Sequence, residues 1–216
     1  MAIEQYTFAS ARDLKDLVES LGWFDTVRTT GDYVIGCLNN VDTLLLCEPT
    51  GSSPNKFYTG TRLIETGANV SGNYTLIYGF KTKNGLLLTH TTSDCQAQVL
   101  LGKTNNGSIA VCMSQSADQY SRTQFYSAAV GESDPAIGSV NRLLTIGNAA
   151  SNTGARYRWV GTSQITSCPI PTCPTNGTSY IKGAKMFITT TLGSMGIVEI
   201  DGVKYATTGD LALNDE

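Results

Sequence analysis

The stretch VEIDGVKYAT, residues 198–207, contains the pattern that decides the fold class. Apolar and polar residues alternate on both sides of Asp201-Gly202, as expected for two half-buried β-strands. An Asp-Gly pair between such runs favours a type I′ turn, because both central residues of that turn need positive φ. The stretch therefore predicts an antiparallel β-hairpin.

Three further dipeptides of this kind separate apolar runs, namely Asn39-Asn40, Asn84-Gly85 and Asn106-Gly107. Each indicates another hairpin, with Asn39-Asn40 the weakest of the signals. A chain of 216 residues with four hairpins predicts a mainly β protein, either an antiparallel β-sandwich or a barrel.

One segment near the N-terminus has helical rather than strand periodicity. Ser10 can cap a helix over about residues 11–21, with Asp13 as a shorter version of the Glu of a capping box. Gly22 follows as the expected left-handed end of the helix. Trp23 and Phe24 are expected to fix the helix against a sheet. The apolar stripe consists of Leu14, Leu17, Val18 and Leu21.

No repeat of 20–50 residues and no Pro-rich linker interrupts the chain, so residues 1–216 are expected to form a single domain. A subdivision near 130–150 is the alternative. Within residues 134–146, Asp134-Pro135 favours the start of a short helix, whereas Gly138 and the β-branched residues favour a strand. The sequence leaves that choice open.

Composition excludes several classes of function. Charged residues make up only 15% of the chain and the net charge is −3, with no basic run that would indicate direct nucleic-acid binding. No apolar stretch is long enough for a membrane span. The start MAIEQYTFAS lacks the pattern of a secretory signal, so synthesis in a cytoplasm is expected.

Sequence motifs of enzymes are also missing. The single histidine, His90, precedes Asp94 and Cys95, but residues five apart on one strand would point to opposite faces, so Cys95 would need a turn to come back within reach. The chain has no G-x-S-x-G elbow and no Gly-rich phosphate loop. We therefore expect no enzyme activity, no cofactor and no metal.

Six cysteines raise the question of disulfides. In the predicted hairpins Cys37 lies opposite Asp42, Cys47 opposite Asp32, and Cys112 opposite Leu101, so no two cysteines pair within a hairpin. In a reducing cytoplasm such residues behave as small buried hydrophobes. Disulfides between distant segments are the alternative.

The segment Cys168–Pro174 (CPIPTCP) carries three prolines, which stiffen it into an extended form. A zinc site would need a second pair of ligands at similar spacing, and the chain has none. The segment is therefore expected to be a stiff, exposed loop at a contact.

Two clusters of aromatic and arginine side chains are candidate recognition surfaces. In GARYRWVG, Arg156 and Arg158 share one face of a strand, and Tyr157 and Trp159 share the other. Such side chains are enriched at protein interfaces, and flat rings also stack on sugars. The alternative is that these aromatic rings are core. The second cluster contains Tyr120, Arg122 and Tyr126.

The end of the chain offers a third candidate. Tyr205 continues the last hairpin, and Leu211 and Leu213 form one more short apolar face. A terminal strand at a sheet edge has unpaired amides and carbonyls that invite a strand from another subunit. We therefore expect a docking edge here; the alternative is that the strand closes the protein's own barrel.

Across its length, the chain resembles the small virion structural proteins of tailed bacteriophages, with a β-body rich in Thr, Gly and Asn, few charges and a D-G-V-x-Y closing hairpin. Asp201, Gly202, Val203 and Tyr205 carry the hairpin part of the resemblance. It implies a virion protein of the head, neck or tail that assembles with copies of itself and other virion proteins. It implies no catalytic residue. A carbohydrate- or receptor-binding β-module, with a glycan or host receptor as partner, is the alternative function.

Overall fold

The computed structural model describes the protein over residues 3–8, 11–31, 33–47, 56–59, 62–65, 75–91, 95–117, 122–130, 144–146, 166–171, 180–188, 196–207 and 211–216. Within these ranges the chain forms one α-helix and seventeen β-strands in three antiparallel sheets. The prediction of a mainly β, antiparallel fold with one N-terminal helix is confirmed.

The central sheet has seven strands in the order β1-β7-β8-β9-β10-β11-β12. Its N-terminal strand, β1, pairs with β7, and the remaining strands follow in chain order. The strands are β1 (Glu4–Thr7), β7 (Thr75–Thr82), β8 (Gly85–Thr91), β9 (Cys95–Lys103), β10 (Ile109–Ala117), β11 (Arg122–Ala129) and β12 (Leu144–Ile146).

Two five-stranded sheets complete the fold. The N-terminal sheet is a meander of β2 (Thr26–Thr30), β3 (Tyr33–Leu38), β4 (Val41–Cys47), β5 (Lys56–Thr59) and β6 (Arg62–Glu65). The C-terminal sheet has the order β13-β14-β17-β16-β15, so its last strand in sequence lies in its middle. Its strands are β13 (Thr166–Pro171), β14 (Tyr180–Ile188), β15 (Gly196–Ile200), β16 (Val203–Thr207) and β17 (Leu211–Asn214).

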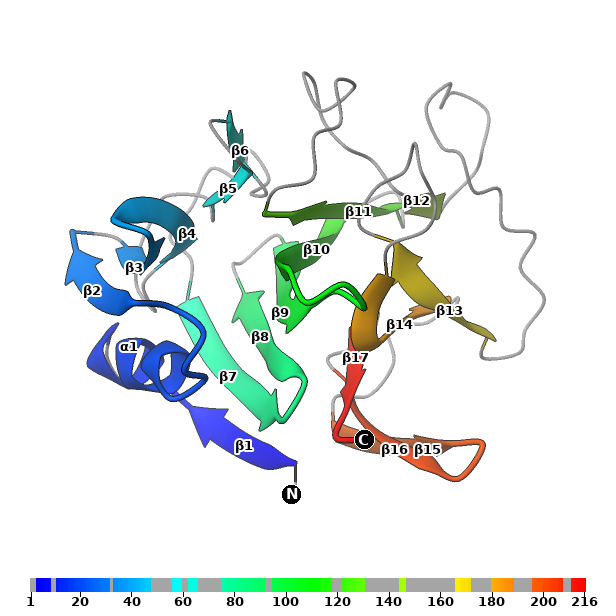
Figure 1. Ribbon diagram of the computed structural model, residues 1–216. Helices are drawn as coiled ribbons and strands as arrows, with labels where there is room; N and C mark the ends of the chain where they lie inside the picture. The colour runs from blue at the N-terminus through cyan, green and yellow to red at the C-terminus, as the bar shows by residue number, and fades with distance from the viewer. Residues whose placement is uncertain are drawn as a thin grey trace.

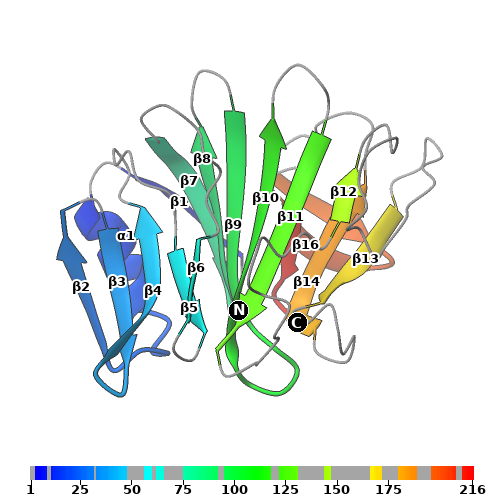
Figure 2. The ribbon, with the colours of Figure 1, turned by 90° about the horizontal axis from the view of Figure 1, so that it is seen from above.

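The central sheet is the middle layer, and each of its faces has its own apolar core. Figure 1 shows α1 (Ala11–Glu19) and β2–β4 on one side of β7–β9, with β14 and β17 on the other. Turned by 90°, the strands of the central sheet stand between the two smaller sheets (Figure 2). This layered packing agrees with the sandwich alternative; within the described residues none of the sheets closes into a barrel.

The first core lies between the central sheet, the helix and the N-terminal sheet. Leu86, Leu88 and Leu101 contribute from the central sheet, and all three are fully buried. The apolar stripe of α1 meets them, as its spacing predicts, and Trp23 and Phe24 pack at the margin. The remaining members are Val27, Val34, Leu44, Leu46, Val99, Ile109 and Val111, with Leu14, Leu17 and Val18 from the helix.

The second core lies on the opposite face of the central sheet. Leu87 and Leu100 alternate with the residues of the first core and face Leu211 and Leu213 of β17. Because both faces of the central sheet are covered, its strands have continuous apolar runs instead of alternation. The other members are Phe80, Ala110, Cys112, Ala129, Ile170, Ile181, Ala184 and Ala206.

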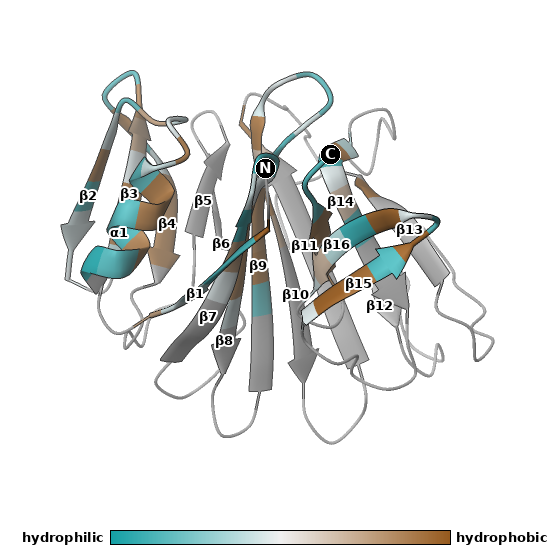
Figure 3. Cartoon of the chain, turned by 90° about the horizontal axis from the view of Figure 1, so that it is seen from below, coloured by the Kyte–Doolittle hydropathy of each residue, from teal (hydrophilic) through white to brown (hydrophobic). Residues whose placement is uncertain are grey.

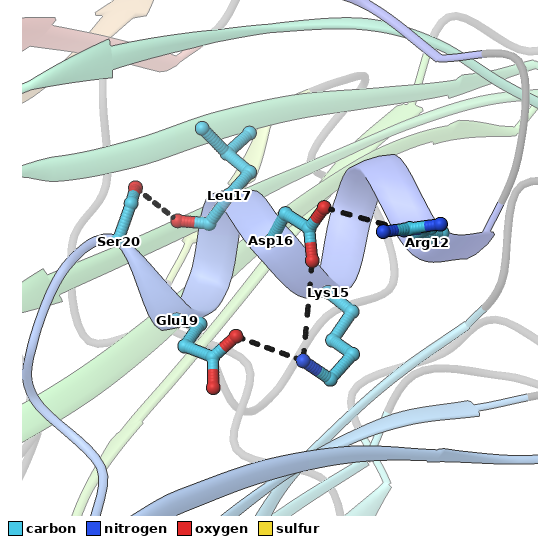
Figure 4. A network of polar contacts seen from close by, with 6 residues as sticks. All are labelled: Arg12, Lys15, Asp16, Leu17, Glu19 and Ser20. Atoms are coloured by element: carbon cyan, nitrogen blue, oxygen red, sulfur yellow. Dashed lines mark hydrogen bonds and ion pairs between the residues drawn. The ribbon is translucent and has the colours of Figure 1, made fainter.

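The outward face of α1 is polar. Figure 4 shows Lys15 bridging Asp16 and Glu19, with Arg12 also close to Asp16. These exposed ion pairs contribute little stability each, so burial of the apolar stripe is what holds the helix. The helix ends as predicted, since Gly22 has a φ of +65°.

Two of the four predicted hairpins have the expected turn. Asn39 and Asn40 have φ values of +52° and +62°, and Leu38 pairs with Val41 across them. Asp201 and Gly202 have φ values of +53° and +81°, as a type I′ turn requires.

The other two hairpins exist, but their turns are each shifted by one residue from the prediction. In the first, Thr82 pairs with Gly85, so Lys83 and Asn84 form the loop. In the second, the Gly107 amide donates to the Thr104 carbonyl at 2.9 Å, and Gly107 has a φ of +86°. A three-residue loop with glycine in the left-handed position explains this second shift.

The pairing register differs from the predicted one at two cysteines, at one because of a shifted turn and at the other because of a bulge. Cys112 lies opposite Leu100 rather than Leu101. A bulge after Gly36 pairs Cys47 with Tyr33 instead of Asp32, whereas Cys37 lies opposite Asp42 as predicted. Cys37 and Cys112 carry thiols rather than disulfides.

The structure describes parts of residues 134–146 and of the Pro-rich segment 168–174. Residues 144–146 form the strand β12, and residues 134–143 lie outside the described ranges. The Pro-rich segment is not an exposed loop over residues 168–171, since it belongs to β13 and its Ile170 is fully buried. Its extended form was predicted correctly, and β13 is an edge strand, where proline is tolerated.

Candidate functional site

The C-terminal strand is not an edge, so the prediction of a docking edge at Leu211 and Leu213 is wrong. β17 pairs with β14 on one side and with β16 on the other. Leu211 and Leu213 are fully buried in the core shared with the central sheet, and Tyr205 is 4% exposed. The ending completes the protein's own C-terminal sheet.

Polar contacts also attach β17 and the residues after it to the central sheet. The Leu211 amide donates to Gln98 Oε1 at 3.1 Å, deep between the two sheets. Asn84 Nδ2 lies 2.7 Å from Asn214 Oδ1 and 3.0 Å from the Glu216 carbonyl oxygen. The turn between β7 and β8 therefore holds the end of the chain in place.

The sequence Leu211-Ala212-Leu213 carries a signal that β17 is an interior strand. All three residues are fully buried. A strand that is covered on both faces has an uninterrupted apolar run, whereas a half-exposed edge strand alternates. Ala212 in the middle of the run is therefore the residue that indicates an interior strand.

The exposed edge of the C-terminal sheet is β15. It stands at the end of the strand order, paired with β16 on one side and, within the described residues, with no strand on the other. Its Ile197 is 57% exposed, the most exposed of the large hydrophobic residues in the described part of the chain. Figure 3 shows the apolar residues of the β15–β16 hairpin in brown and its polar ones in teal.

The two edges of this sheet differ in how they are protected. β13 carries Pro169 and Pro171, and a proline has no amide to offer a further strand. β15 has no proline and only one charged residue, Glu199, among three β-branched apolar residues. Among the residues that the structure describes, the β15 edge is thus open to strand addition, whereas the β13 edge is blocked by its prolines.

The hydrogen-bonding groups available at β15 follow from its hairpin. A two-residue loop is closed by a hydrogen-bonded pair, here Ile200 and Val203, and hydrogen-bonded pairs alternate with non-bonded ones. Val198 therefore also bonds to β16. The N–H and C=O groups of Ile197 and Glu199 point away from it, toward a strand added at the edge.

The other face of the hairpin is braced by Tyr205. Val198, Ile200 and Val203 pack around its ring. The ammonium of Lys185 lies 5.1 Å from the ring centroid, in the geometry of a cation–π contact. Tyr205 thus fixes the position of β15 and is not itself a contact surface.

The structure describes only part of the two aromatic and arginine clusters. Tyr120 and the segment containing Arg156, Tyr157, Arg158 and Trp159 lie outside them. Arg122 and Tyr126 lie in β11, where their backbones pair with Ala117 and Met113. The carbohydrate-binding alternative depends on these clusters and stays a prediction.

The histidine–cysteine pair considered as a nucleophile lies on two strands rather than one. His90 belongs to β8 and Cys95 to β9, which pair with each other. The antiparallel pairing of β8 with β9 brings the chain back past His90, as this pair would need to come within reach. Asp94 lies outside the described residues.

The thiol of Cys37 has a carboxylate as its polar partner. Its Sγ donates to Asp42 Oδ1 at 3.1 Å, and Arg28 binds both oxygens of the same carboxylate at 2.8 Å. Burial, and then the hydrogen bond to Asp42, raises the pKa of the thiol above its ordinary value of 9.0. Because the thiolate is the nucleophile, Cys37 is held in its unreactive form.

The raised pKa of Cys37 predicts a loss of stability at alkaline pH. The unfolded chain loses the thiol proton near pH 9.0, whereas the folded protein keeps it to higher pH. The contribution to the free energy of unfolding is therefore complete below that pH and falls above it. Urea unfolding of wild type and Cys37→Ala at pH 7 and pH 10 measures it, and the stability gap between the two proteins should narrow at pH 10. A gap that does not change with pH would contradict the assignment.

Within the described ranges, no three His, Cys, Asp or Glu side chains form a group that could hold a metal ion. No helix in that part of the chain is long and apolar enough to cross a membrane. Comparison with protein-family models, with curated proteins and with solved structures finds no match for this chain.

Proposed function

We propose that the protein is a structural component of a phage particle, in its head, neck or tail, and that it assembles by pairing the β15 edge with a second copy. The open edge with its exposed Ile197 carries the proposal. The low content of charged residues, 15%, is consistent with a surface that is covered in an assembly.

The backbone of β15 is complementary to itself in the antiparallel direction. If two copies meet with Val198 at the two-fold axis, Ile197 of each lies opposite Glu199 of the other. These are the residues whose N–H and C=O groups point outward, so both pairs exchange backbone hydrogen bonds, each worth about 1 kcal/mol net. A closed two-fold contact is also the commonest symmetry of homo-oligomers.

The side chains fit the same register. Val198 meets Val198 of the second copy as a β-branched, non-hydrogen-bonded pair, in which side chains lie closest. Ile200 lies opposite Gly196, where nothing stands within 4 Å of the position of an added Cβ. The large residue of one strand therefore faces the open space of the other.

The substitution Ile197→Glu tests this contact. It places a carboxylate directly opposite Glu199 of the second copy, and like charges directly opposite each other on paired strands are destabilising. We therefore expect it to convert wild-type dimers or larger oligomers into monomers in light scattering coupled to size exclusion. Val41→Glu is the matched control, because Val41 is 54% exposed but lies at the tip of the β3–β4 hairpin. The control should keep the wild-type mass.

Two outcomes would count against the proposal. A wild-type protein that is monomeric at high concentration would remove self-association altogether. Equal effects of both glutamate variants would remove the β15 edge as the contact while leaving self-association standing. Membership in a phage particle is tested separately, by whether the genes beside this one encode portal, capsid or tail proteins.

A further inference from the structure

Two Asn-Gly dipeptides lie in described turns of the central sheet, and their surroundings are opposite. Asn106-Gly107 is exposed at the tip of the β9–β10 hairpin. Asn84-Gly85 is buried where β7 turns into β8, with Asn84 only 6% exposed. We propose that Asn106 is a site of spontaneous deamidation in the native protein and that the fold protects Asn84 from the same reaction.

The reaction needs only the chain and water. The deprotonated amide nitrogen of the following glycine attacks Cγ of the asparagine, a C–N bond forms, and the bond from Cγ to Nδ2 breaks. The side-chain nitrogen leaves as ammonia with the proton that the backbone amide gave to solvent. Water then opens the five-membered succinimide at either carbonyl, which leaves aspartate or isoaspartate. A following glycine favours the attack because it has no side chain to obstruct it.

Few contacts in the described structure restrain Asn106 from this reaction. Its side chain makes no hydrogen bond to any described residue, and nothing stands within 4 Å of a Cβ position at Gly107. The Gly107 amide donates one hydrogen bond, to the Thr104 carbonyl at 2.9 Å. Since that bond is at an exposed turn, the opening that frees the nitrogen costs little.

Asn84 is held by several contacts at once. Its Nδ2 lies within 3.1 Å of the Asn214 carbonyl oxygen, the Asn214 side-chain oxygen and the Glu216 carbonyl oxygen. Gly85 packs so closely on β9 that an added Cβ would overlap the Leu101 carbonyl oxygen. Attack on Asn84 therefore requires that the end of the chain leave the central sheet.

The product would alter a turn that joins two sheets. The neighbouring Asn105 donates its amide to the Tyr180 carbonyl at 2.9 Å and accepts from the Tyr180 amide through Oδ1 at 3.1 Å. These bonds connect the β9–β10 turn to the start of β14. An isoaspartate at Asn106 adds a backbone carbon and a negative charge beside that connection.

Peptide mapping by mass spectrometry tests the proposal, in native buffer and in concentrated urea at the same mildly alkaline pH. In native buffer, deamidation at Asn106 should be at least about tenfold faster than at Asn84, because Asn84 must first lose its hydrogen bonds. In urea the two sites should react at similar rates. Asn106→Ser should remove the Asn106 product and leave the Asn84 rate unchanged.

Either of two results would overturn the inference. The first is a native Asn106 that stays intact while the same residue reacts in urea, which would mean that the bond from Gly107 to Thr104 protects it. The second is an Asn84 that reacts as fast as Asn106 in the native protein. The proposal does not depend on the assembly proposed above, since it concerns a turn outside the C-terminal sheet.

Discussion

Removal of residues 211–216 is expected to unfold the protein rather than to impair its assembly. The deletion takes out β17, the middle strand of the C-terminal sheet, and leaves β14 and β16 without their shared partner. Loss of the fully buried Leu211 and Leu213 alone corresponds to about 4–10 kcal/mol. Because a typical domain has only about 5–15 kcal/mol of stability, no cooperative thermal transition should remain in circular dichroism.

Shorter changes give the graded control for this experiment. Deletion of Asp215 and Glu216 keeps β17 and removes the contacts to Lys83 and Asn84, so a loss of about 1–3 kcal/mol is expected. Leu213→Ala should cost about 2–5 kcal/mol in urea unfolding and keeps the full chain. A 211–216 deletion that retains the wild-type melting temperature but forms smaller oligomers would restore the edge interpretation of this strand.

The sequence predicted local structure well where a short pattern is sufficient. The stripe of α1 and the positive-φ turns at Asn39-Asn40 and Asp201-Gly202 were each predicted from residues adjacent in the chain. The mainly β fold class followed from the number of predicted hairpins. These features depend on local backbone preferences, which a single sequence carries.

The register of the other hairpins could not be predicted in this way. An Asn-Gly pair suits a type I′ turn, and it also suits a longer loop with glycine in the left-handed position. Alternation normally selects the register, but Val99, Leu100 and Leu101 are all fully buried. A strand that is apolar on both faces loses nothing from a one-residue shift in its hydrophobic pattern, so the pattern could not select between the turns.

The candidate edge illustrates the same limit at the level of sheets. The hairpin at residues 198–207 was predicted, and its first strand is the open edge. Whether the terminal strand β17 lies inside the sheet or at its edge depends on its pairing with β14, which is distant in sequence. The local pattern therefore predicts an edge at the terminal strand, and only Ala212 between Leu211 and Leu213 indicates an interior strand.

The second large effect is expected for Gly85→Ala, at the start of β8. Gly85 has a φ of +147°, a region that residues other than glycine rarely adopt, at a cost of about 1–3 kcal/mol. In addition, its added Cβ would overlap the carbonyl oxygen of Leu101 on β9. A backbone oxygen within a ladder cannot move aside as the end of a flexible side chain can. The β8–β9 pairing must therefore shift at Gly102, which lies opposite Gly85.

Gly196→Ala is the matched control, because Gly196 also begins a strand and has the same φ of +147°. Within the single chain nothing lies within 4 Å of its Cβ position, so at a protein concentration where the chain is monomeric this variant measures the backbone strain alone, about 1–3 kcal/mol. Overpacking adds about another 1–3 kcal/mol or more at Gly85. Urea unfolding of both variants gives the difference directly. Equal losses of stability would mean that β8 and β9 can separate locally without cost, and the close approach of Gly85 to Leu101 would then have no part in holding the central sheet together.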